Sequence, residues 1–207
     1  MNKGLMIVFI GTDGSGKTTI IDALPKYLKD NGLNYSISYY HWRPGYIIKK
    51  EQHKEGVRVE DPHAKPPYGF VKSFAKFLLI NFDYFLGYQF EIKKKLKQGE
   101  LVVFDRYFYD YYLDEARYRL SLKDSLIHMF QFMIPKPDMT FLLLGTPEVL
   151  YERKKEISVD EIYNQSKKII KYEGYMAPTQ KINVDKEVSI VVDCIGSWIV
   201  EQNRGRK

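Results

Sequence analysis

The chain has 207 residues, 44% of them hydrophobic and 28% charged, which is ordinary for one globular domain with a full core. Its net charge is +6, but the lysines and arginines are scattered among acidic residues. This pattern favours solvated faces plus an anion-binding pocket and argues against nucleic-acid binding. The single cysteine, Cys194, allows no intrachain disulfide, and no run reaches the roughly 18 apolar residues of a transmembrane segment. Because a strand is expected by Leu5, no signal peptide is expected, and the composition favours a cytoplasmic protein.

The most informative motif is the stretch G-T-D-G-S-G-K-T-T at residues 11–19, which fits the phosphate-loop pattern G-x-x-x-x-G-K-[ST]. Glycines let a backbone approach an anion closely, and successive N–H groups then hold the phosphate oxygens. Lys17 is expected to reach the outer phosphates of ATP, and the hydroxyl of Thr18 is expected to ligate Mg²⁺. The predicted ATP-binding residues are Gly11, Asp13, Gly14, Ser15, Gly16, Lys17, Thr18 and Thr19.

The sequence around this motif supports it. The apolar run 5–10 predicts a strand before the loop, and the stripe of Ile20, Leu24 and Leu28 predicts an amphipathic helix after it. Asn31-Gly32 is a helix stop signal. Strand, loop and helix therefore come in the order that a phosphate loop requires, whereas an ordinary glycine-rich turn is the alternative.

Residues 35–40 predict a second strand that leads into the turn H-W-R-P-G. Residues 46–69 show little periodicity and predict a long mobile loop, which in compact domains is often functional. Residues 70–98 predict the longest helix. Its apolar stripe would consist of Phe74, Phe77, Leu78, Phe82, Phe85, Leu86, Phe90 and Ile92. We interpret this stripe as a core face, with contact to a membrane surface or a partner helix as the alternative.

The second half of the chain continues the alternation. Strands are predicted at 101–105, 139–144 and 188–192, and helices at 107–133 (two, around Ser121), 147–155, 158–172 and 195–202. A capping box joins Ser158 to Glu161. Asp105 would lie at the carboxyl end of its strand, where ligands bind in α/β sheets. The order of elements predicts a single α/β domain over 1–207, with a doubly wound parallel five-stranded sheet and helices on both faces.

Four motifs together resemble the thymidylate kinase family of P-loop nucleoside monophosphate kinases. They are the phosphate loop, L-V-V-F-D-R-Y around Asp105, P-K-P-D before a strand, and P-E-V-L-Y-E-R-K-K-E from Pro147. The V-V-D at 191–193 also fits. The resemblance implies a P-loop kinase fold with a lid at about 153–161. It also implies phosphoryl transfer from Mg-ATP to a small-molecule phosphate acceptor, and it admits a homodimer.

The resemblance assigns roles to individual residues. Lys17 and the loop amides would hold the ATP phosphates, while Thr18 and Asp105 would hold Mg²⁺. Arg106 would grip the acceptor's phosphate with its bidentate guanidinium, and Asp13 would face the acceptor's sugar or hydroxyl groups. One of the lid cations at 153–155 would stabilise the transferred group. The predicted catalytic residues are Lys17, Asp105, Arg106 and Arg153, and the predicted acceptor-binding residues are Asp13, Arg43, Arg106, Tyr107 and Asp110.

The acceptor side departs from the family pattern. Asp83-Tyr84 stands where the base-contacting arginine belongs, Arg43 replaces a glutamate before P-G, Asp110 replaces a serine, and Asp114-Glu115 replaces the base-reading tyrosine–glutamine pair. Asp110, Asp114 and Arg117 are spaced to share one helical face, and carboxylates suit sugar hydroxyl groups. We therefore expect thymidylate to be a poor acceptor. The patterns H-W-R-P and D-R-Y-x-Y-D also resemble the thymidylate-kinase-like proteins associated with bacterial surface-polysaccharide genes.

A regulatory GTPase shares the phosphate loop and is the first alternative from another class. A regulatory GTPase would need N-K-x-D after a strand, and neither 144–146 nor 193–195 provides it. Two alternatives stay open. One is a nucleotide-binding regulatory or accessory protein without phosphotransfer, and the other is a nucleoside or sugar kinase that uses an unphosphorylated acceptor.

Overall fold

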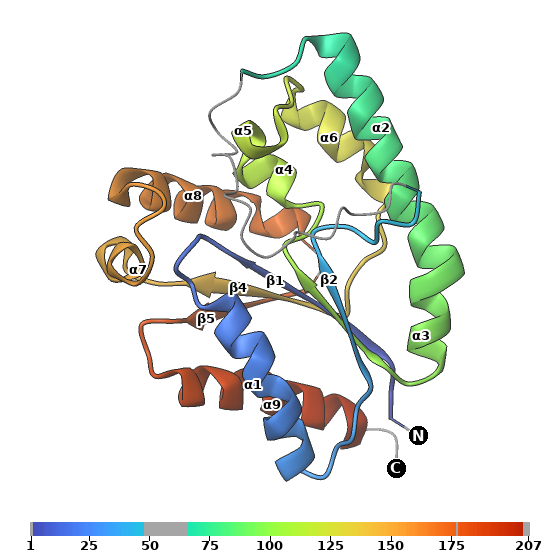
Figure 1. Ribbon diagram of the computed structural model, residues 1–207, viewed down its shortest axis with the longest axis vertical. Helices are drawn as coiled ribbons and strands as arrows, with labels where there is room; N and C mark the ends of the chain where they lie inside the picture. The colour runs from blue at the N-terminus through green and yellow to red at the C-terminus, as the bar shows by residue number, and fades with distance from the viewer. Residues whose placement is uncertain (1, 48–65, 177, 205–207) are drawn as a thin grey trace, which may run out of the picture.

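The computed structural model describes residues 2–47, 66–176 and 178–204. Its centre is a parallel sheet with the strand order β2-β3-β1-β4-β5 (Figure 1). The strands are β1 (Leu5–Gly11), β2 (Ile37–His41), β3 (Leu101–Asp105), β4 (Met139–Leu144) and β5 (Thr179–Asn183). Helices cross over between parallel neighbours, so the predicted five-stranded doubly wound fold is confirmed.

Helices cover both faces of the sheet. They are α1 (Lys17–Asp30), α2 (Phe70–Gly87), α3 (Lys93–Lys97), α4 (Asp110–Leu113), α5 (Glu115–Tyr118), α6 (Asp124–Phe130), α7 (Pro147–Arg153), α8 (Val159–Tyr172) and α9 (Val188–Arg204). α1 and α9 lie side by side on one face, and α2, α4, α6 and α8 contribute to the core of the other (Figure 1). Strands β1 and β3 are buried along their full length because apolar cores form on both of their faces.

The predicted last strand at 188–192 is wrong, and the V-V-D at 191–193 does not end a strand. These residues begin α9, whose buried positions include Val191, Val192 and Ile195 and follow a helical spacing. The run is rich in β-branched residues, but packing against α1 and the sheet overrides that local preference. The fifth strand is instead β5, an edge strand in which only Ile182 is buried, so it carries almost no apolar signal.

The segment predicted as one helix at 70–98 contains α2, a π-helical stretch at Tyr88–Ile92 and α3. Phe77 and Ile92 of the predicted stripe are buried, but Phe82, Phe85 and Phe90 are exposed. The core face of α2 also includes Ile80, Asn81 and Tyr84, which follow Phe77 at helical spacing. The expected core stripe is therefore only partly correct, because aromatic residues occur on both the inner and the outer face.

The two helices expected at 107–133 are also subdivided. A break at Asp114, with φ near −140°, separates α4 from α5, and α6 is followed by a 3₁₀ turn at Gln131–Met133. The capping box at the start of α8 is confirmed on one side, since the amide of Glu161 donates to the hydroxyl of Ser158.

Most of the predicted mobile loop, residues 48–65, lies outside the described residues. Among the helices that are described, none has both the length and the apolar character needed to cross a membrane.

Candidate active site

The phosphate loop joins β1 to α1 at the carboxyl edge of the sheet. Gly16 immediately precedes α1 and has φ +77°, and a Cβ atom built there would meet nothing within 4 Å. Gly14 has φ +84°, and its Cβ would lie 2.3 Å from the carbonyl oxygen of Leu150 in α7. The loop therefore packs tightly against α7 at Gly14 and stays open at Gly16, as a backbone that must approach an anion requires.

Replacing Gly14 by alanine should destabilise the protein and weaken ATP binding. The substitution adds left-handed strain of roughly 1–2 kcal/mol, and relieving the contact with Leu150 should cost roughly 1–3 kcal/mol more. Gly32→Ala is the matched control, because Gly32 has φ +78° and open space around it. Urea unfolding of both variants measures the difference, and equal losses of stability would show that the loop does not depend on its contact with α7.

The side chain of Lys17 is buried inside the loop that it follows. Its Nζ donates to the carbonyl of Gly11 at 2.8 Å, to the carbonyl of Thr12 at 3.0 Å and to the hydroxyl of Ser15 at 3.3 Å. Burial, assisted by the positive charge of Arg106, lowers the pKa of Lys17 to about 8. A charged ammonium in such a place is stabilised by an anion in the loop, which fits the phosphate chain of ATP.

Asp105 ends β3 beside the loop. Its Oδ2 accepts from the hydroxyl of Tyr39 at 3.2 Å and lies 3.5 Å from Nδ1 of His41. Burial alone would raise the pKa of Asp105, but the hydrogen bond from His41 and the charge of Lys17 lower it. Its Oδ1 is buried and has no partner within the part of the chain that the structure describes.

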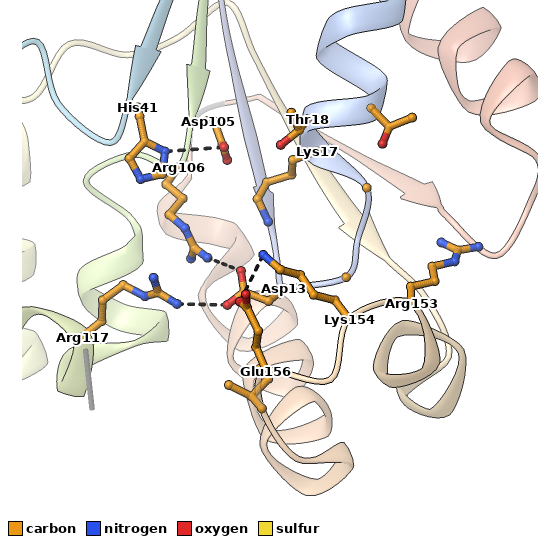
Figure 2. Close-up of a pocket in the computed structure, with 14 residues that line it drawn as sticks. Asp13, Lys17, Thr18, His41, Asp105, Arg106, Arg117, Arg153, Lys154 and Glu156 are labelled. Atoms are coloured by element: carbon orange, nitrogen blue, oxygen red, sulfur yellow. Dashed lines mark hydrogen bonds and ion pairs between the residues drawn. The ribbon is translucent and has the colours of Figure 1, made fainter. Parts of the chain in front are cut away.

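These features fit a magnesium ion. Mg²⁺ keeps several waters and is held by one or two protein oxygens plus substrate phosphates. The ionised Asp105 and the hydroxyl-bearing Thr18 line the same cavity (Figure 2). The described residues contain no cluster of three or more His, Cys, Asp or Glu side chains that could bind a metal alone. The donor set therefore suits a metal that arrives with a nucleotide.

Arg106 follows Asp105 in a left-handed conformation, φ +66°, which is costly for a residue with a side chain. Its amide donates to the carbonyl of Phe9 at 3.1 Å. Its Nη1 lies 3.1 Å from Oδ2 of Asp110, and its Nη2 lies 2.7 Å from Oδ1 of Asp13. Burial would lower the pKa of Arg106, but Asp110 and Asp13 outweigh it and raise the pKa. The strained turn thus directs a permanently charged guanidinium toward the phosphate loop.

Arg117 reaches the same carboxylate from α5. Its Nε lies 2.8 Å from Oδ2 of Asp114, and its Nη2 lies 3.0 Å from Oδ2 of Asp13. Figure 2 shows both arginines pointing at Asp13 from the same side. Burial would raise the pKa of Asp13, but the charges of Arg106, Lys17 and Arg117 hold it below its usual value. The break at Asp114 therefore places Arg117 beside Arg106, whereas a shared face of one continuous helix had been predicted.

These groups surround a cavity of about 880 Å³, which is large enough for a nucleotide-sized ligand. Its lining includes six of the eight predicted ATP-binding residues together with Asp105 and Arg106. The residues that line it are Asp13, Gly14, Gly16, Lys17, Thr18, Thr19, His41, Asp105, Arg106, Arg117, Arg153, Lys154, Glu156 and Ile157. The phosphate loop and the residues at the end of β3 therefore face the same cavity.

The three cations of the predicted lid differ in position. Arg153 and Lys154 line the cavity, whereas Lys155 is absent from its lining and pairs with Glu152 at 3.1 Å. Nη1 of Arg153 donates to the carbonyl of Val184 at 2.8 Å. Lys154 extends toward Asp13 in Figure 2 and pairs with Glu156 at 3.1 Å. Lys154 therefore lies nearer to the carboxylate of Asp13 than Arg153 does, since Arg153 is held at Val184.

Three predicted acceptor-binding residues are not among the cavity-lining residues. Nη1 of Arg43 pairs with Oδ2 of Asp83 at 3.0 Å. Tyr107 is fully buried, and its hydroxyl donates to the carbonyl of Pro135 at 2.7 Å. Asp110 is buried behind Arg106. Of the three, Asp110 contacts a residue that lines the cavity, since it holds the guanidinium of Arg106.

The sequence interpretation did not select His41 as a site residue. His41 had been assigned only to a turn, yet it lines the cavity and contacts Asp105. Parallel pairing of β2 with β3 puts the two residues in register, His41 opposite Asp105. His41 and Asp105 each end a strand of the parallel sheet, and this shared position in the sequence pattern could have indicated their contact.

A parallel sheet with a phosphate loop after β1 and a carboxylate at the end of β3 defines a P-loop phosphotransferase. A family model described as thymidylate kinase matches residues 72–193, more than half of the chain. The chain belongs to the thymidylate kinase family and is a nucleotide kinase-like phosphotransferase. The phosphate loop precedes the matched segment, so its assignment rests on its own sequence and geometry.

Similar proteins support this assignment. A thymidylate kinase of Clostridium novyi (strain NT) is 30% identical over 156 residues, which cover 74% of this chain and 71% of the relative. One of Prochlorococcus marinus (strain AS9601) is 30% identical over 161 residues, covering 75% and 73%. One of Buchnera aphidicola subsp. Baizongia pistaciae is 28% identical over 174 residues, covering 81% and 77%.

Proposed function

We propose that this protein transfers the terminal phosphoryl group of Mg-ATP to the phosphate of a small acceptor. The observation that carries the proposal is the single cavity that brings Lys17 of the loop together with Asp105 and Arg106. Catalysis of phosphoryl transfer consists mostly of positioning and charge neutralisation, and these three side chains suit both tasks.

In this proposal each residue that lines the cavity has a separate task in binding or in transfer. The loop amides and Lys17 hold the ATP phosphates, and the hydroxyl of Thr18 and Oδ1 of Asp105 serve as metal ligands. Mg²⁺, when bound, neutralises charge on the phosphates. Arg106 holds the acceptor's phosphate in line, and residues 153–161 act as a lid that brings Lys154 or Arg153 to the transferred group.

We further propose that thymidylate is not the preferred acceptor. The named relatives are thymidylate kinases, so thymidylate is the first acceptor to test. However, the position expected to read the base carries Asp83, which is fully buried and bound to Arg43 and to the amides of Gly45 and Ile47. A side chain committed in this way has no oxygen left to direct at a base.

The test is a coupled assay of ADP formation with Mg-ATP, thymidylate and a panel of other nucleotides, sugars and sugar phosphates. We expect kcat/KM for thymidylate to be lower than for the best acceptor by roughly 10⁴-fold, since a missing base-reading group discriminates strongly. Saturable activity with micromolar thymidylate would contradict the acceptor proposal. ATP binding without transfer to any member of the panel would favour a nucleotide-binding accessory protein.

A further inference from the structure

The first turn of α2 and the residue that follows α5 form a basic surface at one end of the molecule (Figure 1). Tyr68 lies at its centre. The Nζ atoms of Lys72 and Lys76 are 4.3 and 5.4 Å from the centre of the tyrosine ring. The guanidinium carbon of Arg119 is 4.0 Å from the same point. Three positive charges therefore surround one aromatic ring, and we call these four residues the Tyr68 cluster.

Hydrogen bonds hold the two segments of the cluster together. The amide of Tyr68 donates to the carbonyl of Arg119 at 2.9 Å. The guanidinium of Arg119 donates in return to the hydroxyl of Tyr68 and to the carbonyl of Pro66, both at 2.9 Å. Nζ of Lys76 donates to the carbonyl of Tyr118 at 2.8 Å. These contacts also offset the strain of the left-handed backbone at Arg119, φ +55°, so the cations are fixed close to one another.

No carboxylate balances this charge within the described part of the chain. Residues 66–82 and 116–123 contain no acidic residue. No ion pair between described residues includes Lys72, Lys76 or Arg119. Burial lowers the pKa of Lys76, and the positive charges of Arg119 and Lys72 lower it further. Cations that repel one another in this way are stabilised by an anion from outside the chain.

Two apolar side chains are exposed beside these cations. Phe70 and Val71 begin α2, and they are 60% and 81% exposed. A soluble anion would satisfy the cations but would leave both apolar side chains in water. A phospholipid surface satisfies both groups, because its headgroups are anionic and its interface accepts apolar side chains.

A second copy of this chain is a poorer partner for this surface. In a twofold symmetric contact the same patch meets itself, so the three cations of one copy would face the three cations of the other. Like charges that face each other across an interface weaken association. The charge of the surface therefore favours an anionic partner.

We propose that this end of the molecule docks on an anionic phospholipid surface. The Tyr68 cluster binds the headgroup phosphates, and Phe70 and Val71 enter the interface beside them. The site is separate from the cavity, because none of these residues lines it, and the proposal does not depend on phosphoryl transfer. The docking is peripheral and reversible, since a few side chains give far less affinity than an inserted helix.

The test is cosedimentation of the full chain with vesicles of equal parts phosphatidylcholine and phosphatidylglycerol, and with vesicles of phosphatidylcholine alone. The wild type should partition onto the anionic vesicles at least about 10-fold more strongly than onto the neutral ones. Lys72→Gln combined with Lys76→Gln should lower the partition coefficient roughly 25-fold, because each cation near such a surface contributes roughly fivefold. Phe70→Ser combined with Val71→Ser should lower it roughly 10-fold through the lost apolar contact. Lys72→Gln alone keeps the bond from Lys76 to Tyr118 and should lose roughly fivefold, which covers poor folding of the double variant.

Each double variant has a matched control. Lys93→Gln combined with Lys97→Gln makes the same change in net charge, with the same spacing, at two exposed positions of α3. Phe132→Ser removes an apolar side chain that is 82% exposed outside the cluster. Both controls should stay within about twofold of the wild type, since charges more than a Debye length from the surface are screened. Thermal melting followed by circular dichroism confirms that each variant is folded.

Equal losses in the Lys72 and Lys76 variant and in its Lys93 and Lys97 control would overturn the proposal, because binding would then follow net charge alone. Full vesicle binding by the Phe70 and Val71 variant would also overturn it, since only the headgroup phosphate would then be recognised. Light scattering without vesicles tests the remaining occupant. A dimer that is lost in the Phe70 and Val71 variant would assign this surface to a second copy and would overturn the proposal as well.

Discussion

Replacing Lys17 by alanine should abolish phosphoryl transfer and weaken ATP binding. The ammonium is the only Lys17 group that can neutralise charge on the outer phosphates, and it already lies among the loop oxygens of Gly11, Thr12 and Ser15. Loss of one positioned donor to developing charge lowers kcat by about 10²-fold to 10³-fold, and loss of a full positive charge should cost at least that. The measurements are steady-state ADP formation and titration with β,γ-imido-ATP.

The matched control for this experiment is Lys26→Ala. Lys26 belongs to the same helix, but its side chain is 85% exposed and pairs with Asp30 at 2.8 Å. Its removal should leave kcat and nucleotide affinity within about twofold of the wild type, since a solvent-exposed i,i+4 ion pair is screened by water and contributes little to stability. Normal turnover by a correctly folded Lys17→Ala protein would be incompatible with the phosphate-loop assignment.

Arg43→Ala should be strongly destabilising, by about 3–5 kcal/mol, because it leaves a buried carboxylate without its charged partner. Asp83 has no exposed surface, and Arg43 is only 11% exposed in its side chain. The pair joins the turn after β2 to the C-terminal part of α2, and Asp83 also accepts the amides of Gly45 and Ile47 at 2.8 and 2.6 Å. Urea unfolding with and without the substitution measures the change in free energy.

A second variant separates this structural role from the acceptor-binding role predicted from the sequence. Arg43→Met combined with Asp83→Asn removes both charges and keeps an amide oxygen that can still accept from the turn, so it should recover part of the lost stability. If the ion pair is structural, kcat/KM of the folded double variant should stay close to the wild-type value. Wild-type stability with a large fall in acceptor kcat/KM in Arg43→Ala would instead restore Arg43 to the acceptor site.

The ion pair of Arg43 and Asp83 also depends on Gly87, where the turn after β2 packs against α2. A Cβ atom at Gly87 would lie 2.5 Å from Cβ of Pro44, so glycine lets the turn after β2 approach α2 closely. This approach brings Arg43 to Asp83. Neither the glycine nor the two opposite charges, which are 40 residues apart, indicates the pairing in the sequence, because the pairing depends on how a loop and a helix meet.

Local chemistry, which can be recognised in the amino-acid sequence, specifies several parts of this protein. The phosphate loop, the buried strand that ends at Asp105 and the cap at Ser158 each require particular residues at fixed spacing, so they could be identified without a structure. The overall α/β class followed from the alternation of apolar strands with amphipathic helices.

The long-range partners of those residues depend instead on how the elements pack in three dimensions. Residues 188–192 have strand-like composition, yet they form a helix because α1 and the sheet bury one helical face, while the polar run at 179–183 becomes an edge strand by pairing with β4. Arg117 meets Asp13 across 104 residues only because the chain breaks at Asp114. Such contacts depend on the distance between elements that are far apart in sequence, and local propensity and spacing contain no information about that distance.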